Sequence, residues 1–490
     1  MKIAIVGAGW AGCAAAVEAT RLGHQVTLFE AARTPGGRAR RVMATLGGAP
    51  MALDNGQHIL IGAYSETLRL MKDLGVNESA AFLRLPLTMQ FPDGSGLKLP
   101  NWPAPLDALA GIATAGGWPW ADKLSLLKVA LGWQLGGFKC RPEQSVSDLC
   151  RGLAPGAMAS LIEPLCVSAL NTPAGRASGQ VFLRVLRDSL FAASGGSNLL
   201  LPRQDLSALL PDAALAWLGA QGGTVRLGVR IQAMAAATIA NTAPTAATPA
   251  VGAGTDTGAS ATSTPSTSAT SAPPGWILST ADSRETFERV ILACPPNEAA
   301  RLAESAGAAD DWLAQAHGLQ HEALCTVYAQ APGARLQQPM LALPASAREP
   351  AQFVFDRGQL GGPAGLLAFV ISASNGDSAL LTQQVLAQAA RQLGLSGLQP
   401  VQTIVEKRAT FACTPGLLRP PAQIAPGLLA CGDYVAGPYP ATLEGAVRSG
   451  LEAARLVVTS RTIIRSLIEQ VRMGMVPIFH GLHRCFAFQG

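Results

Sequence analysis

The chain has 490 residues, 49% of them hydrophobic and only 14% charged, so disorder is excluded as its default state and two or three interlocked globular domains are expected. Its 37 Lys and Arg residues against 32 Asp and Glu leave a net charge of +5, which is too diffuse for a nucleic-acid-binding protein. The nine cysteines are scattered without metal-ligand spacing, which predicts no metal site and a reducing, cytoplasmic compartment.

The first predicted element is a buried strand over residues 2–6, and the sequence GAGWAG follows it directly. This is the G-x-G-x-x-G pattern of a nucleotide-binding βαβ unit. The first glycine permits a tight turn, the second admits a pyrophosphate, and the third lets the next helix pack on the strand. All six residues of this loop are expected at the cofactor: Gly7, Ala8, Gly9, Trp10, Ala11 and Gly12.

A helix is predicted over 14–23, followed by a second strand over 24–30 that ends in Glu30. Glu30 stands 18 residues after Gly12, where a carboxylate accepts hydrogen bonds from the ribose hydroxyls of an adenosine and disfavours a 2′-phosphate. A purely structural glycine turn is the alternative, but strand, helix and carboxylate all stand in register. Together they predict a bound adenosine diphosphate group.

The next segment favours FAD over NAD. Residues 33–38 read RTPGGR, which resembles the GGR element of the flavin amine oxidase and phytoene desaturase superfamily. The resemblance implies that Gly36 and Gly37 let the loop lie against the cofactor and that Arg38 faces the pyrophosphate. Residues 53–58 (LDNGQH) resemble the stretch that runs beside the flavin, with Gly56 allowing close backbone approach.

Three later segments fit the same superfamily. Residues 224–231 resemble the strand whose backbone meets the adenine near Ile231, and residues 290–296 resemble the strand and turn that return to the nucleotide domain. Residues 428–455 form the third segment, in which an apolar strand ends at a Gly-Asp pair and a helix follows.

This third segment is expected to hold the flavin. Its Gly432 and Asp433 stand where the superfamily places a carboxylate on a ribityl hydroxyl. Thr442 suits a helix N-cap, and the amide of Leu443 is expected to point at the flavin pyrimidine, where a helix N-terminus stabilises negative charge on the reduced ring. An ordinary capped helix after a turn is the alternative.

The motifs lie at both ends and in the middle of the chain, so the FAD-binding domain is expected to be discontinuous. The predicted fold class is mixed α/β and α+β, with a Rossmann-type FAD-binding domain and an inserted substrate domain of helices and mixed sheet. The predicted FAD-binding domain comprises residues 1–75, 200–300 and 405–460, and the predicted substrate domain comprises residues 76–199 and 301–404.

Two segments stand apart by composition. Residues 235–275 are almost entirely Ala, Thr, Ser, Pro and Gly, which predicts a low-complexity loop inserted between two strands. Residues 461–490 mix Arg and His with apolar residues. Such a tail suits either a helix on the inner, anionic face of a membrane or a helix packed on the protein.

Several phrases that are less generic than the flavin motifs narrow the resemblance. They are DNGQHILIGAYSETLRLMKDLG at 54–75, PLT at 86–88, PLCVSALNTP at 164–173 and GDYVAGPYPATLEGAVRSG at 432–450. With them the chain resembles the hydroxysqualene dehydroxylases, FAD-dependent, desaturase-like enzymes of squalene and hopanoid biosynthesis. The resemblance implies a lipophilic isoprenoid substrate in a long apolar tunnel. It also implies reductive loss of an allylic hydroxyl, in which hydride from reduced FAD quenches the resulting cation.

That reaction needs a proton source for the leaving hydroxyl. His58 titrates in the useful range and lies in the segment expected beside the flavin, although a structural histidine at a glycine turn is the alternative. Tyr434 and Tyr439 flank the start of the flavin helix, where a phenol either donates a proton or walls the pocket. Asp54 suits a ribose or backbone ligand.

Three other functions stay open at this point: a carotenoid- or phytoene-type desaturase or isomerase, a flavin amine oxidase, and a non-catalytic FAD-binding scaffold. An amine oxidase usually needs an aromatic cage, and only four tyrosines in the chain argue against one. Glu30, Arg38 and Asp433 together favour a retained cofactor. No feature of the sequence identifies the electron donor.

Overall fold

The N-terminal βαβ unit forms where the sequence predicts it. In the computed structural model, strand β1 spans Lys2–Val6, helix α1 spans Trp10–Arg21 and strand β2 spans Gln25–Glu30. The helix begins four residues earlier than predicted, which puts Gly12 in its first turn. A Cβ at Gly12 would lie 1.9 Å from the carbonyl oxygen of Gly7, so only glycine lets the helix start this close to the strand.

The structure describes residues 1–103, 105–190, 195–237 and 275–472, with side chains up to residue 457 in the last helix. Nearly all of the predicted insert at 235–275 lies outside the described residues. Residues 473–490 of the predicted tail also lie outside them.

A six-stranded sheet organises the nucleotide-binding half. The strand order is β10-β2-β1-β14-β21-β20, parallel except for β20. The strands not yet given are β10 (Thr224–Leu227), β14 (Arg289–Leu292), β20 (Gln423–Ala425) and β21 (Leu428–Ala430). The inner parallel strands β2, β1, β14 and β21 are largely buried, which matches the apolar runs in their sequences. The strand predicted over 224–231 ends early because Gly228 turns the chain with φ of +74°.

The last helix packs on the first. Helix α15 spans Leu443–Arg472 and crosses α1 where Gly450 meets Ala11. A Cβ on Gly450 would lie 2.1 Å from the Ala11 carbonyl oxygen, so the two helices approach closely at this glycine. This contact joins an early and a late segment of the chain, and it sets the N-terminus of α15 beside that of α1.

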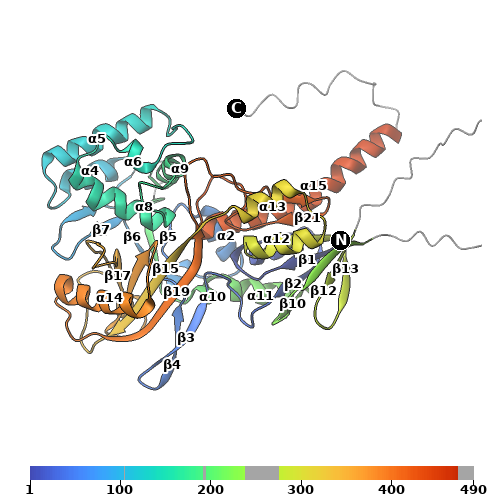
Figure 1. Cartoon of the computed structure of the whole chain (residues 1–490), viewed down its shortest axis with the longest axis horizontal. Helices are drawn as coiled ribbons and strands as arrows, with labels where there is room; N and C mark the ends of the chain where they lie inside the picture. Colours follow the sequence, from blue (N-terminus) through green and yellow to red (C-terminus); the bar gives the residue numbers. More distant parts are fainter. Residues whose placement is uncertain (104, 191–194, 238–274, 473–490) are drawn as a thin grey trace, which may run out of the picture.

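A second, antiparallel sheet lies next to the first (Figure 1). Its order is β16-β17-β18-β15-β19, and helix α14 (Ser378–Leu393) packs against β15 and β19. The strands are β15 (His321–Gln330), β16 (Met340–Ala342), β17 (Phe353–Asp356), β18 (Leu366–Ser372) and β19 (Gln399–Phe411). The domain boundary expected at residue 405 falls inside β19, and we propose placing it after Phe411.

For residues 76–199 the helical spacing of apolar residues predicts mainly helices, and helices make up most of the regular structure there. The helices are α3 (Glu78–Ala81), α4 (Leu106–Thr114), α5 (Trp120–Leu135), α6 (Val146–Leu149), α7 (Pro155–Ala157), a π-helical turn (Met158–Ile162), α8 (Glu163–Leu170) and α9 (Gly179–Leu190). The segment also contains three strands that the prediction missed: β6 (Phe82–Leu85), β7 (Thr88–Gln90) and β8 (Gly96–Lys98). Such short strands show little alternation, because their partners rather than their own pattern stabilise them.

The remaining elements connect these parts. The strands are β3 (Arg41–Leu46), β4 (Ala49–Asp54), β5 (Leu60–Ile61), β9 (Leu199–Pro202), β11 (Ala233–Ala237), β12 (Gly275–Ser279) and β13 (Arg284–Phe287). The helices are α2 (Ser65–Asp73), α10 (Leu206–Leu209), α11 (Pro211–Ala220), α12 (Pro296–Ser305), α13 (Asp310–His317) and a 3₁₀ turn (Arg357–Leu360). Among the described residues, none of these helices combines the length and the apolar character that a membrane crossing needs.

Candidate active site

A long groove runs along the carboxyl ends of the parallel strands. Its empty volume is about 2740 Å³, part of which is open to solvent. Open α/β sheets bind ligands at this edge. Sixteen of the predicted site residues line the groove: Gly7, Gly9, Trp10, Ala11, Glu30, Gly36, Gly37, Arg38, Gly56, His58, Ile231, Gly432, Asp433, Tyr434, Thr442 and Leu443. The remaining two, Ala8 and Gly12, lie beneath its wall.

The GGR loop lies directly on the glycine turn. Gly9 and Gly36 form an isolated parallel bridge, and the Gly36 amide donates to the Ala8 carbonyl oxygen at 2.9 Å. A Cβ on Gly37 would lie 3.2 Å from the Gly9 Cα, so the two backbones are nearly in contact. Gly9 is also the N-cap of α1, whose free amides and dipole favour a phosphate group at this point.

Glu30 is held at the end of β2 by backbone amides. Its two carboxylate oxygens accept hydrogen bonds from the amides of Ala8 at 2.7 Å and Ala32 at 2.8 Å. These bonds fix the carboxylate beside the glycine loop, with lone pairs left for the hydroxyls of a ribose. At the same end of the groove lies Ile231, whose carbonyl oxygen accepts from Arg301 at 3.1 Å.

Two predicted residues from distant parts of the sequence are in direct contact. Arg38 and Asp433, 395 positions apart, form an ion pair through Nη2 and Oδ1. Arg38 also donates to the Ala409 carbonyl oxygen at 2.9 Å. Asp433 is only 7% exposed, so the guanidinium stabilises a carboxylate that would otherwise be buried without a partner. The pair sets a cation and an anion side by side in the groove. A pyrophosphate would need the cation, and a ribityl hydroxyl would need the anion as a hydrogen-bond acceptor.

The N-terminus of α15 closes the far end of the groove. The Thr442 hydroxyl accepts from the Gly445 amide at 3.1 Å, which confirms the predicted N-cap. Glu444, in the first turn of the same helix, has another role: its buried carboxylate accepts from the backbone amides of Glu66 and Thr67 at the start of α2. One helix end thus caps a second, and Leu443 lines the groove.

Two buried polar atoms of groove residues indicate a missing partner. Among the described residues, the Tyr434 hydroxyl and the Gln57 side-chain nitrogen are buried and make no hydrogen bond. Buried polar groups are nearly always paired, so a ligand with donors and acceptors along this groove is expected. With the glycine bridge, the α1 N-terminus and the Arg38–Asp433 pair, these atoms fit the predicted FAD.

His58 lies on the wall of the groove in its neutral form. Its Nδ1 is 2.8 Å from the Gly56 carbonyl oxygen, which can only accept, so Nδ1 carries the proton. Burial lowers the pKa of His58, and the nearby Arg38 charge acts in the same direction. In this tautomer the other ring nitrogen is an acceptor. His58 in this state is therefore better suited to receive a proton than to donate one.

The surroundings of Tyr434 and Asp54 favour a structural role for each of these side chains. Burial raises the pKa of Tyr434, and the neighbouring Cys294 and Cys431 act in the same direction, which places its phenol near the nucleotide end. Asp54 accepts from the Leu206 amide at 2.7 Å and does not line the groove, so it is a backbone ligand. Burial raises the pKa of Asp54 to about 7.

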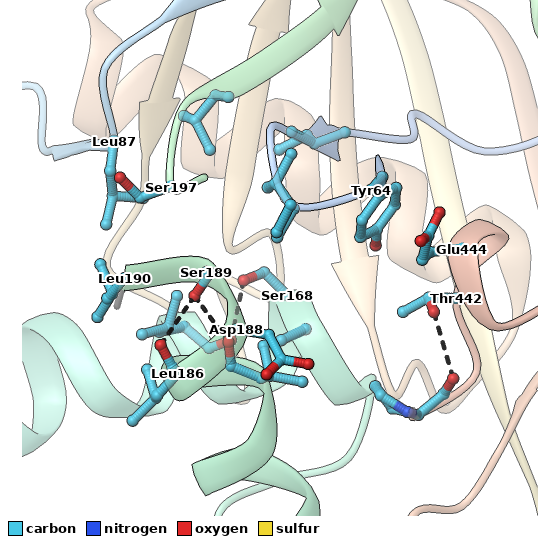
Figure 2. Close-up of a pocket in the computed structure, with 18 of the residues that line it drawn as sticks. Tyr64, Leu87, Ser168, Leu186, Asp188, Ser189, Leu190, Ser197, Thr442 and Glu444 are labelled. Carbon is cyan, nitrogen blue, oxygen red and sulfur yellow. Dashed lines mark hydrogen bonds between the residues drawn. The ribbon is translucent and has the colours of Figure 1, made fainter. Parts of the chain in front are cut away.

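A second cavity opens beside the flavin end of the groove. Its empty volume is about 1070 Å³, and apolar side chains form most of its wall. We call it the apolar chamber. Figure 2 shows Tyr64, Thr442 and Glu444 on one side of it, Leu87, Leu190 and Ser197 on the other, and Asp188 between them.

The groove and the apolar chamber meet. Six residues line both cavities: Ile59, Tyr64, Ser168, Ala169, Phe353 and Thr442. Because Thr442 caps the helix expected at the flavin ring, the junction lies where a bound flavin would face the chamber. A long apolar molecule in the chamber would therefore reach the reactive part of the cofactor.

One polar pair lies in the chamber wall. Asp188 Oδ2 accepts from the Tyr439 hydroxyl at 3.1 Å and from Arg184 Nε at 2.7 Å. The guanidinium carbons of Arg184 and Arg448 lie 5.5 and 5.3 Å from the centre of the Tyr439 ring. Burial raises the pKa of Tyr439, so its phenol stays protonated at neutral pH.

The sequence analysis missed Asp188 and most of the chamber. The residues that form it come from separate segments within 59–64, 87–89, 165–169, 185–199, 340–353 and 439–444. The only signal for Asp188 was its place four residues after Arg184 on an amphipathic helix, a pattern that usually marks a solvated ion pair. Tyr439 was noted, but its partner could not be.

Comparisons with known proteins agree with this geometry. Residues 5–74 match the family model described as NAD(P)-binding Rossmann-like domain, and residues 261–458 match flavin containing amine oxidoreductase. Among solved structures, an oxidoreductase from Methanosarcina mazei has a TM-score of 0.65 at 16% identity and covers 93% of this chain and 100% of its own. Putrescine oxidase bound to putrescine has a TM-score of 0.62 at 17% identity, covering 94% and 99%. These likenesses show the fold.

Curated relatives match over nearly the full length. Hydroxysqualene dehydroxylase of Rhodopseudomonas palustris is 28% identical over 484 residues, covering 93% of this chain and 98% of the relative. The protein of the same name from Sinorhizobium fredii is 24% identical and covers 94% and 98%. Zeta-carotene desaturase of Zea mays is 37% identical, but over only 79 residues, which are 16% of this chain and 13% of that protein.

Proposed function

We propose that this chain is an FAD-dependent oxidoreductase of the flavin amine oxidase superfamily that converts hydroxysqualene to squalene by reductive removal of the hydroxyl group. The observation that carries the proposal is the junction between the cofactor groove and the apolar chamber. A C30 isoprenoid needs such a long apolar cavity that ends at the flavin. The full-length likeness to proteins named hydroxysqualene dehydroxylase supports the same substrate.

The reaction divides into two steps. Departure of the allylic hydroxyl as water takes up one proton and leaves a delocalised carbocation. Bound, reduced FAD supplies the hydride that converts this cation into a hydrocarbon. The protein has three tasks: to hold the isoprenoid, to exclude bulk water from the cation, and to deliver the proton.

We assign the leaving hydroxyl to the Asp188–Tyr439 pair. Both known contacts of Asp188 use Oδ2, so Oδ1 can accept the hydrogen bond of a substrate hydroxyl. The Tyr439 phenol is protonated and lies three residues before Thr442, at the flavin end of the chamber. It is the donor best placed to protonate a hydroxyl held by Asp188. His58 and Tyr434 stay as second candidates on the cofactor side.

Two arginines beside this pair disfavour an amine substrate. An amine oxidase binds its cationic substrate between aromatic rings, and Tyr64 and Tyr439 do line the chamber. However, the guanidinium groups of Arg184 and Arg448 already lie over the Tyr439 ring. Their positive charges would repel an ammonium group at this position.

The test uses the purified holoprotein, reduced without oxygen and mixed with hydroxysqualene. We expect flavin reoxidation together with squalene, measured by absorbance and mass spectrometry. Tyr439→Phe should slow both by at least about tenfold at unchanged FAD content, as is usual for loss of a general acid. His58→Ala and Tyr434→Phe are the matched comparisons, and a loss confined to either would move the proton donor to that residue.

Other substrates decide between this function and its rivals. The oxidised holoprotein is mixed without oxygen with a polyene of the carotenoid series or with putrescine. Flavin reduction by either compound, with no reoxidation of the reduced protein by hydroxysqualene, would refute the proposal in favour of a desaturase or an amine oxidase. Absence of turnover with all three would favour a scaffold.

A further inference from the structure

We propose that helices α4 and α5 form a surface that docks on the anionic interface of a phospholipid bilayer. The surface consists of seven exposed large apolar side chains, which we call the α4–α5 apolar face: Trp102, Leu106, Leu109, Trp120, Leu124, Leu131 and Leu135. Across the described residues there are thirteen exposed side chains of this kind, and the other six are scattered over the rest of the chain. Exposed large apolar side chains gathered in one part of the sequence and on neighbouring helices mark a candidate interaction site.

The helix geometry aligns these side chains. On α5 the positions of Trp120, Leu124, Leu131 and Leu135 differ by four, seven and four residues, which places them on one side of the helix. Their exposed fractions lie between 54% and 80%. Sixteen residues of helix extend about 24 Å at 1.5 Å per residue, so the stripe can lie flat along an interface.

Contacts within the protein hold the two helices in place. The buried ammonium of Lys123 donates to the Ala113 carbonyl oxygen at the end of α4, at 2.8 Å. The same ammonium lies 5.1 Å from the centre of the Trp120 ring. Leu126, on the opposite side of α5, is buried in the main core. The apolar face is therefore preorganised and directed away from the protein.

The composition of the face selects a membrane interface as the occupant. Two of the seven residues are tryptophans, which favour the headgroup level of a bilayer. The exposed cations Lys128, Lys139 and Arg141 lie on the stripe or just beyond the end of α5, where they can meet anionic headgroups. A second copy of this chain would bring the same three cations together across the contact.

The position of the face suits delivery of a lipid. Helix α4 packs on β8, and β8 pairs with β7, whose Thr88 and Met89 line the apolar chamber. Thus α4 packs on one strand of a hairpin whose other strand lines the chamber. Figure 1 shows α4 and α5 at one end of the long axis and the described end of α15 toward the other. The face and the predicted C-terminal tail are thus separate candidates for membrane contact.

The test is flotation of the full-length holoprotein with vesicles of phosphatidylglycerol and phosphatidylethanolamine, with phosphatidylcholine vesicles in parallel. We expect binding to the anionic vesicles, weaker binding to phosphatidylcholine and weakening by salt. The variant Trp120→Ser/Leu131→Ser/Leu135→Ser should bind at least about tenfold more weakly, because three large apolar groups no longer enter the interface. Its bound FAD and melting temperature show that it is folded.

Two further variants complete the design. Leu22→Ser/Leu380→Ser/Leu418→Ser removes exposed leucines elsewhere and should float like the wild type. Arg461→Ser/Arg465→Ser/Arg472→Ser tests the tail and should retain most of the binding. Equal flotation of the wild type and the α5 variant overturns the proposal, as does a wild type that stays unbound. A change in oligomeric mass with α5 substitution, without vesicle binding by the wild type, would assign the face to a second copy. No substrate is needed, so the outcome is independent of the proposed reaction.

Discussion

The cofactor groove and the apolar chamber meet at Thr442, yet they are built in opposite ways. Backbone amides, glycine turns and one ion pair form the groove, and most of its determinants lie in short motifs. Side chains from six separate segments form the chamber, and the sequence phrases that cover four of these segments do not reveal that they meet. A cofactor site therefore depends on local backbone geometry, whereas a substrate site depends on how distant segments pack. Substitutions in one cavity should leave the other largely intact.

The largest effect is expected at the glycine turn. Gly12→Ala introduces a Cβ at 1.9 Å from the Gly7 carbonyl oxygen, so α1 must shift away from β1. We expect a loss of about 2–4 kcal/mol in the free energy of unfolding and of most bound FAD, measured by denaturation and flavin absorbance. Gly219→Ala in α11 meets no atom within 4 Å and should be neutral or stabilising. Equal behaviour of the two variants would contradict the steric role of Gly12.

The ion pair across the groove comes next. Arg38→Ala leaves the buried Asp433 carboxylate without its cation, and we expect FAD affinity to fall by at least about tenfold, followed by fluorescence titration. Arg38→Lys should recover part of the affinity, because it restores the charge but not the planar fork. Arg33→Ala, on an exposed side chain of the same loop, is the control. Unchanged affinity in Arg38→Ala would remove this residue from the cofactor site.

A chamber substitution should separate the two cavities. Ala63 lines the chamber but not the groove, and Ala63→Phe places a ring in the substrate space. We expect kcat/KM for squalene formation to fall by at least about tenfold, while FAD content and the flavin spectrum stay as in the wild type. Ala216→Phe on the exposed surface of α11 should retain activity. Loss of FAD in the Ala63 variant would show that the two cavities are not independent.

The smallest effect concerns a buried acid outside both cavities. Burial raises the pKa of Asp54 to about 7, above its ordinary value of 3.8, so the folded state favours the protonated form. Its contribution to stability is full below about pH 4 and is lost as the pH rises through about 7. Asp54→Asn keeps an acceptor for the Leu206 amide and should flatten the dependence of Tm on pH between 4 and 7 by a few degrees. Asp93→Asn, on an exposed turn, is the control and should leave the dependence of Tm on pH unchanged. The same unchanged dependence in the Asp54 variant would contradict the raised pKa.

Much of the fold was predictable where local patterns decide it. The strand at 2–6, the strand ending at Glu30 and the helix after Thr442 form as expected, because β-branched runs, turns and caps are short-range features. The strands at 82–98 were missed because each has only three or four residues and depends on its partner. The boundary expected at 405 fell inside β19 for a related reason: that strand belongs to the five-stranded sheet through pairing with β15.

The candidate site also divides into features that local motifs predict and features that depend on tertiary contacts. Sixteen of the eighteen predicted residues line the groove, since motif spacing reports where the backbone turns toward a nucleotide. The sequence could not predict the protonation states and hydrogen-bond partners of the candidate residues. Burial lowers the pKa of His58, the Gly56 carbonyl contact fixes which ring nitrogen carries its proton, and Glu444 caps α2 instead of merely starting its own helix. Both depend on neighbours that folding supplies.

By itself, the sequence determined that this protein binds FAD in a Rossmann-type domain, because the glycines, Glu30, Arg38 and Asp433 define backbone turns and charges that need little context. Only the tertiary structure decided that Arg38 and Asp433 touch and that Asp188 meets Tyr439 in an apolar wall. It also left the α4–α5 apolar face exposed. Contacts across hundreds of residues and the exposure of a helix face follow from packing, which no local pattern encodes.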